Sequence, residues 1–145
     1  MTRYVVHAGV VLRLASEERQ VSAEHRLLAP TLLRSQVLSA LHAAVHNGAL
    51  PADAVRDRLD RIARMPIRLL GDGVLRRRAW EVADRLGWAG TEDAEYVALT
   101  QLQADAFVTL DEELARSVVG IVATVRYDEL PLGAVGALPH PATEA

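Results

Sequence analysis

The sequence predicts an α/β domain whose central, mostly parallel sheet of about four or five short strands is flanked by helices. Short runs of β-branched and apolar residues alternate along the chain with longer segments whose apolar residues recur at helical spacing. Strands and helices that alternate in this way typically build a parallel sheet covered by helices. The chain has 145 residues, of which 50% are hydrophobic, and this is enough for one domain with its own core.

The first predicted elements are a strand and two helices. Residues 4–6 form a β-branched run, and apolar residues in 10–14 follow a small-residue turn, which suits a strand followed by a helix. Residues 27–29 are apolar but too few to assign. In residues 32–45 the apolar side chains share one helical face, and an Asn-Gly pair, which tolerates left-handed backbone geometry, ends this helix.

The middle of the chain predicts two more helices with a short extended segment between them. Residues 55–63 place apolar side chains on one face of a charged helix that ends before Pro66. Residues 67–70 are a brief apolar run, which indicates a short strand or an extended connection. Residues 74–86 return to helical spacing, and Gly87 ends that helix.

The last third predicts a helix, a strand and a final extended run. Residues 91–103 form another helix, and residues 106–110 a compact strand that leads into a short helix. Residues 118–125 are a last β-branched run. Proline and glycine are frequent beyond it, so we expect residues 1–128 to form the domain and residues 129–145 a flexible tail.

Composition excludes several classes of site. The formal net charge of -3 gives no global basic field, so any RNA contact would need a local patch. Cysteine is absent, which excludes disulfides, thiolate metal sites and cysteine nucleophiles and is consistent with a reducing, cytoplasmic location. All 16 basic residues are Arg, which favours bidentate contacts with carboxylate or phosphate. No stretch is long and apolar enough to span a bilayer.

Three segments, in order along the chain, form a recognisable set. Residues 4–17 read YVVHAGVVLRLASE, and residues 27–41 read LLAPTLLRSQVLSAL. Residues 91–115 read TEDAEYVALTQLQADAFVTLDEELA, in which Asp93 opens an apolar helix and Asp111 ends a Thr-x-Asp motif after a strand. In order and spacing, these segments resemble the motifs of the PIN domains of VapC-like toxin ribonucleases, and the resemblance extends to about residue 125.

The resemblance implies a PIN-like three-layer fold and a set of site residues. In that family four carboxylates gather around Mg²⁺ or Mn²⁺, and a metal-bound water attacks an RNA phosphodiester. Asp93 and Asp111 match the two late acids and are the implied catalytic and metal-binding residues. An Asp normally stands at the place of His7, and a Glu at the place of Gln36. The family also implies a small antitoxin as partner, whose chain lies across the acidic cleft and often inserts an Arg, and a homodimer formed through helices.

The two replaced acids predict that metal binding is weak or absent. His7 and Gln36 remove two negative charges from the site. At contact distance each charge is worth on the order of several kcal/mol toward a cation at an effective dielectric constant of about 20. Because about 1.4 kcal/mol is tenfold in affinity, Mg²⁺ binding should be severely weakened. We therefore expect ribonuclease activity to be lost or strongly attenuated, and function through binding of an antitoxin or RNA.

In an alternative interpretation, the protein is an active enzyme. A metal-dependent endoribonuclease could use Asp93 and Asp111 together with a substitute carboxylate, and His7 could serve as a ligand or general base. An imidazole ligand would shift the preference of the site toward Zn²⁺, Ni²⁺ or Mn²⁺. The substitute carboxylate could come from one of four nearby residues, namely Glu92, Glu95, Glu112 and Glu113.

Each site residue also has an ordinary structural interpretation. After a strand, Asp111 is a typical helix N-cap, and Asp93 is a first-turn carboxylate that the helix dipole favours. Gln36 would be a hydrogen-bonded polar residue at the edge of the core. His7 would be a neutral imidazole hydrogen-bonded to Asp93 or Asp111.

Three further features are assigned structural roles. His42 and His46 are spaced i, i+4 but lack the Glu of the HExxH motif, so we expect surface histidines. Residues 76–78 are three arginines on an amphipathic helix, which indicates a solvated face rather than an RNA contact. Trp80 and Trp88 are expected to pack. No glycine-rich phosphate loop is present, so nucleotide-cofactor binding has no support from motifs.

Overall fold

The computed structural model describes residues 1–134, in which strands and helices alternate as predicted. The central sheet consists of β1 (Arg3–Val6), β3 (Arg26–Pro30), β4 (Ile67–Leu70), β5 (Ala106–Val108) and β6 (Thr124–Val125). The helices are α1 (Ala8–Glu17), α2 (Leu33–His46), α3 (Val55–Arg64), α4 (Gly73–Leu86), α5 (Glu92–Gln103) and α6 (Glu112–Ser117). Two 3-10 turns, η1 (Ala52–Ala54) and η2 (Tyr127–Glu129), and a pair of strands, β2 (Arg19–Val21) and β7 (Leu132–Ala134), complete this part. None of its helices could cross a bilayer.

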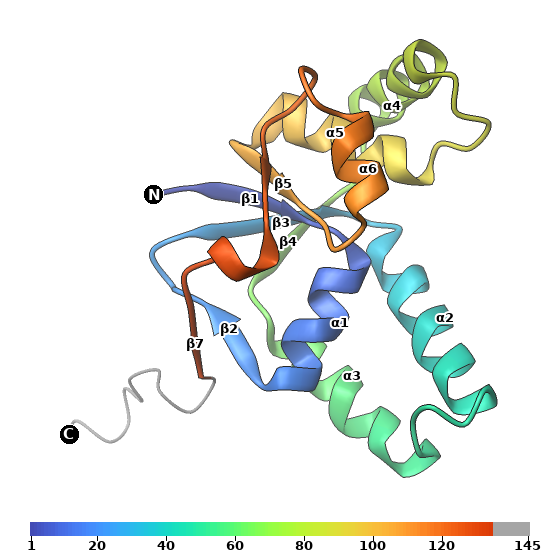
Figure 1. Ribbon diagram of the computed structural model, residues 1–145, viewed down its shortest axis with the longest axis vertical. Coiled ribbons are helices and arrows are strands. Elements are labelled where there is room, and N and C mark those ends of the chain that lie inside the picture. The colour runs from blue at the N-terminus through green and yellow to red at the C-terminus, as the bar shows by residue number, and fades with distance from the viewer. Residues whose placement is uncertain (135–145) are drawn as a thin grey trace.

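The central sheet has the order β4-β3-β1-β5-β6, and every neighbouring pair is parallel. Helices α1, α2 and α3 lie on one side of it, and α4 and α5 lie on the other (Figure 1). This arrangement confirms the predicted α/β class, with five strands in the sheet. From β1 the chain continues to β3 and β4 on one side, whereas β5 and β6 are added on the other, so the order of strands reverses beside β1. Ligands of open parallel sheets bind at such a switch point, beyond the carboxyl ends of the strands.

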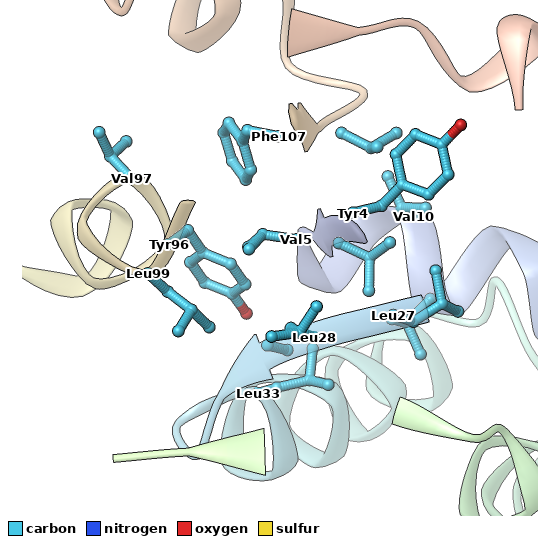
Figure 2. Close-up of a cluster of buried hydrophobic side chains, with 14 of the residues drawn as sticks. Tyr4, Val5, Val10, Leu27, Leu28, Leu33, Tyr96, Val97, Leu99 and Phe107 are labelled. Carbon is cyan, nitrogen blue, oxygen red and sulfur yellow. The ribbon is translucent and has the colours of Figure 1, made fainter. Parts of the chain in front are cut away.

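The core is centred on β1 and β5 and on the face of α5 that covers them. Val5, Tyr96 and Phe107 are fully buried, and Figure 2 shows the two aromatic rings close to Val5. The ring centroids of Tyr96 and Phe107 are 6.0 Å apart. Apolar residues on both faces of a parallel strand are expected when helices cover both faces, which explains why these strands read as continuous apolar runs.

The predicted extended run over residues 118–125 is wrong for most of its length. Only Thr124–Val125 form a strand, β6. Val118 is buried directly after α6, and Gly120 has a φ of 85°, a left-handed conformation that turns the chain before it reaches the sheet. The β-branched residues of this run therefore serve packing at a helix end more than strand formation.

Part of the predicted tail is ordered. Residues 132–134 form β7, which pairs antiparallel with β2. Leu132 lies opposite Val21, which is buried, and the amide of Ser22 donates to the carbonyl of Pro131 over 2.8 Å. These contacts attach the chain after η2 to the α1 end of the molecule, where Figure 1 places β2 and β7 side by side. The remaining predicted tail, residues 135–145, lies outside the described residues.

The N-cap of α4 gives a first prediction. Asp72 accepts a hydrogen bond from the amide of Leu75 over 2.9 Å, which satisfies one of the free amides at the start of the helix. Asp72→Ala should therefore lower the free energy of unfolding by about 1 kcal/mol, and Asp72→Asn, which keeps an acceptor, by much less. Urea denaturation measures both, and an equal loss in the two variants would contradict the capping role.

Candidate functional site

His7 stands at the carboxyl end of β1, at the switch point of the sheet. Its backbone amide donates to the carbonyl of Val108 over 3.0 Å, which extends the pairing of β1 with β5 by one residue. Its backbone is extended, with φ -70° and ψ 156°, and α1 starts at the next residue. The imidazole contacts Asp93 in the first turn of α5 and the ring of Phe107 on β5.

The imidazole of His7 is hydrogen-bonded at both nitrogens. Nε2 lies 3.0 Å from Oδ1 of Asp93, and Nδ1 lies 3.0 Å from Oγ1 of Thr109. The side chain of His7 is 18% exposed and that of Asp93 45% exposed, so the contact is partly open to solvent. The structure thus shows the hydrogen-bonded imidazole expected from the ordinary interpretation of position 7.

The hydrogen bonds of Thr109 favour one arrangement of donors and acceptors around the ring of His7. The amide of Asp111 donates to Oγ1 of Thr109 over 3.1 Å, so this hydroxyl already accepts one hydrogen bond. Its own proton can then go to Nδ1 of His7, which leaves the proton on Nε2 to be donated to Asp93. This arrangement gives the Thr109 hydroxyl, the Asp111 amide and the His7 ring each a hydrogen-bond partner.

Gln36 joins the same cluster through Tyr96. The hydroxyl of Tyr96, on α5, donates to Oε1 of Gln36, on α2, over 2.6 Å. The ring of Tyr96 meets the ring of His7 edge to face, with centroids 4.8 Å apart. Burial raises the pKa of Tyr96 far above its ordinary value, and the nearby Asp93 carboxylate raises it further, so the hydroxyl remains a donor. The amide oxygen at position 36 thus has a defined partner, as expected of a polar residue at the core edge.

Asp111 has two roles in this geometry. Its Oδ1 accepts from the amide of Leu114 over 3.0 Å, so it is the N-cap of α6. It also lines a cavity of about 290 Å³ that contains Asp93. The cavity is lined by Trp88, Gly90, Glu92, Asp93, Asp111, Glu113, Leu114 and Ser117. Four of these residues are acidic, and they come from the starts of α5 and α6, where the helix dipoles favour negative charge.

Among the described residues, the side chains at this site are not grouped around one divalent metal ion of the kind the resemblance implies. Within residues 1–134, no three His, Asp or Glu side chains are grouped so that they could hold one ion. No buried side-chain nitrogen or oxygen of this part lacks a hydrogen-bond partner that a metal would otherwise supply. Hard cations need several oxygen ligands at once, and because His7 holds one oxygen of Asp93 and the cap of α6 one of Asp111, each of these carboxylates has only its second oxygen open to an ion.

The four predicted site positions are therefore linked, but through residues that sequence reasoning did not single out. His7 contacts Asp93 directly, whereas Gln36 is connected through Tyr96 and Asp111 through Thr109. The signals for both connecting residues were present. Tyr96 lies one helical turn after Asp93, and Thr109 is the first residue of the Thr-x-Asp motif. Glu92 and Glu113 line the acidic cavity, and Glu95 and Glu112 do not.

The other candidates lie elsewhere. His42 and His46 are exposed on α2, as expected. Trp80 is 70% exposed on α4, so the expectation that it packs is wrong, whereas Trp88 is half-buried against the core. The arginines of residues 76–78 lie on the outer part of α4, where Arg78 pairs with Glu81 at 3.6 Å.

Comparison with known proteins identifies the fold. No family model and no curated protein matches the sequence. Among solved structures, PAE2754 from Pyrobaculum aerophilum is similar with a TM-score of 0.65 and 21% identity, over 88% of this chain and 92% of that one. VapBC2 from Rickettsia felis, bound to a DNA fragment from their promoter, is similar with a TM-score of 0.62 and 8% identity, over 86% of this chain and 98% of that one. Together with the five-stranded parallel sheet and its flanking helices, these similarities show that the chain has a PIN-like fold.

Proposed function

We propose that this chain is a VapC-like PIN protein of a toxin–antitoxin type system that acts by binding, with metal-dependent RNA cleavage lost or strongly attenuated. The observation that carries the proposal is the pair of hydrogen bonds at His7. They fill the position at which the family has an acid, and they engage Asp93, one of the two remaining acids. The fold similarity to a VapBC complex supports the toxin–antitoxin context.

The acidic cavity favours a protein partner that presents an arginine. Its four carboxylates are not grouped for a single ion, but a guanidinium is wider and has five donors in a planar fork. Trp88 in the wall offers an aromatic face for the same group. A small antitoxin crossing this cavity with an Arg inserted would therefore neutralise the acids without a metal. RNA bound without cleavage is the second ligand that the family implies.

Glu92 and Glu113 favour a second candidate function. Both line the cavity together with Asp93 and Asp111, so a rotation of their side chains could complete a set of oxygen ligands. The protein would then be an active endoribonuclease dependent on Mg²⁺ or Mn²⁺. This candidate requires Glu92 and Glu113 to turn toward the second oxygens of Asp93 and Asp111, because the His7 contact and the α6 cap already use one oxygen of each.

An RNA cleavage assay distinguishes the two candidates. Purified protein is incubated with structured RNAs in Mg²⁺, Mn²⁺ or Zn²⁺, beside Asp111→Asn, which keeps the helix cap but removes the charge. We expect no cleavage that depends on Asp111, and calorimetry showing no Mg²⁺ binding at millimolar concentrations. Cleavage that disappears in Asp111→Asn would favour the enzyme and contradict the proposal.

Co-expression with the small open reading frame next to the gene tests the partner. We expect a complex that co-purifies and that is weakened by Asp93→Asn combined with Asp111→Asn, because these changes remove two charges facing the inserted cation. The double change Asp57→Asn and Asp60→Asn on α3, which removes two charges away from the cavity, is the matched control. Light scattering on the same samples tests the expected homodimer. Failure to recover any complex would count against the antitoxin as partner.

A further inference from the structure

A second cavity lies on the other side of the β5–α6 connection from the acidic one. Its volume is about 530 Å³, within the range of small-molecule sites. Its walls come from α1, from the connection between β5 and α6, from α6, and from the chain between β6 and η2. It is lined by Arg13, Thr109, Leu110, Glu112, Ala115, Arg116, Thr124, Val125, Arg126, Tyr127 and Asp128. It therefore lies beyond the carboxyl ends of β5 and β6, where ligands of parallel sheets bind.

Arg13 lies at this cavity in contact with Glu17 and Tyr127. Its Nε donates to Oε2 of Glu17 over 3.0 Å, and its guanidinium carbon lies 4.1 Å from the ring centroid of Tyr127. The hydroxyl of Tyr127 donates to the other oxygen of Glu17 over 2.8 Å. The hydrogen bonds from Arg13 and Tyr127 lower the pKa of Glu17, so this carboxylate remains charged beside Arg13. Within residues 1–134, no hydrogen bond or ion pair occupies the two terminal nitrogens of Arg13.

Two more arginines line the same cavity from different segments. Arg116, on α6, makes no ion pair with any acid of the described residues. Arg126, after β6, pairs only with Asp128 among those residues, at 3.6 Å, and both of these side chains are 76% exposed. A pair this long and this exposed is weak, so its guanidinium can turn to another acceptor. Guanidinium forks from three segments can together bind a phosphate through several charge-assisted hydrogen bonds.

The remaining lining residues indicate what the phosphate is attached to. Glu112 and Asp128 are carboxylates that can accept hydrogen bonds from sugar hydroxyls. Their negative charges repel a ligand that carries several phosphates in a row. Leu110, which is partly exposed, and Val125 give an apolar wall. The cavity thus combines phosphate donors, hydroxyl acceptors and an apolar surface, although its donors are side chains and not a glycine-rich loop.

We propose that this cavity binds a small phosphomonoester that has hydroxyl groups and an apolar or aromatic body, such as a nucleoside monophosphate. The proposal follows from the convergence of Arg13, Arg116 and Arg126 on one cavity with Glu112 and Asp128. This binding goes beyond the proposed function and does not depend on it, because it requires no antitoxin, metal ion or RNA cleavage.

Calorimetric titration of the full chain tests the site, at low salt so that ionic contacts are not screened. The probes are 5′-AMP, adenosine and a single-stranded RNA oligomer without a terminal phosphate. We expect saturable binding of 5′-AMP, displacement by inorganic phosphate, and no binding of adenosine. Equal affinity for adenosine, tighter binding of the oligomer than of 5′-AMP, or no binding of 5′-AMP would each overturn the proposal.

Matched variants distinguish binding at the cavity from a general effect of the protein's net charge. Arg116→Gln should weaken 5′-AMP binding by about tenfold or more, since a charge-assisted hydrogen bond is lost. Arg126→Gln removes the guanidinium of a second cavity arginine, at an exposed position. A thermal melt of each variant verifies that it is folded. Arg77→Gln, on the exposed side of α4, makes the same change of net charge away from the cavity and should leave the affinity unchanged. An equal loss in Arg77→Gln, or none in both cavity variants, would contradict the assignment.

Discussion

Replacing His7 with Asp is expected to make the stability of the protein depend on a divalent cation. The change removes the hydrogen bond between the imidazole and Asp93 and places a second carboxylate next to that of Asp93. Like charges at about 4 Å repel by about 4 kcal/mol at an effective dielectric constant of 20, and the partial exposure of Asp93 reduces this to about 1–3 kcal/mol. In EDTA the melting temperature should fall by roughly 5 °C.

Magnesium or manganese should reverse the fall in melting temperature of His7→Asp and leave the melting temperature of the wild type unchanged. A cation that binds only the folded state stabilises it by about 1.4 kcal/mol at ten times its dissociation constant. Adding Gln36→Glu should lower the cation concentration required by about tenfold or more, because it contributes a further charge next to Tyr96. Melting curves at a series of cation concentrations measure both effects.

His7→Asn is the control for this experiment, because it removes the imidazole without adding a carboxylate. It should lose stability in the same direction but show no response to Mg²⁺. If the wild type gained as much from Mg²⁺ as His7→Asp does, the natural site would already bind the metal. If His7→Asp gained nothing, positions 7 and 93 would not form a cation site together. Either result would contradict the role of His7 as the residue that takes the place of a metal-binding acid.

The elements that the sequence predicts correctly are those whose pattern repeats over many residues. Helices α2, α4 and α5 each have three or more turns of apolar periodicity, so the predicted ends agree with the structure to within one or two residues. The pair β2 and β7 is not predicted, because each strand has three residues and the partners lie near opposite ends of the described chain. The run 118–125 reads as extended because β-branched residues suit both strands and packed loops.

The site could be predicted in its positions but not in its contacts. The placement of His7 and Asp111 after strands, and the resemblance that paired them with Gln36 and Asp93, identified the residues that the structure links. The hydrogen bonds of Thr109 and Tyr96 depend on side-chain conformations and on the packing of α5 against β1 and β5. The sequence contains the positions of the two connecting residues, one helical turn after Asp93 and in the Thr-x-Asp motif, but no spacing rule specifies their hydrogen bonds, which emerge only in three dimensions.

Phe107→Ala is expected to destabilise the core strongly and to disturb the site as well. Phe107 is fully buried on β5, and its ring centroid lies 5.7 Å from that of His7 and 6.0 Å from that of Tyr96. Truncating a buried aromatic ring leaves a cavity and costs about 3–5 kcal/mol. A domain of this size is typically stable by about 5–15 kcal/mol, so the variant should retain only part of its stability.

Urea denaturation measures this loss, and the exposed Val119 provides the comparison. Val119→Ala also removes apolar atoms, but at a position that is 74% exposed, and should change the free energy of unfolding by less than about 0.5 kcal/mol. Because the Phe107 ring packs against His7, its loss should also broaden or shift the imidazole resonances of His7 in nuclear magnetic resonance spectra. A loss below about 1 kcal/mol, with unchanged His7 resonances, would mean that β5 does not pack under the site as described. The hydrogen bonds of His7 would then lack the rigid support on which their geometry depends.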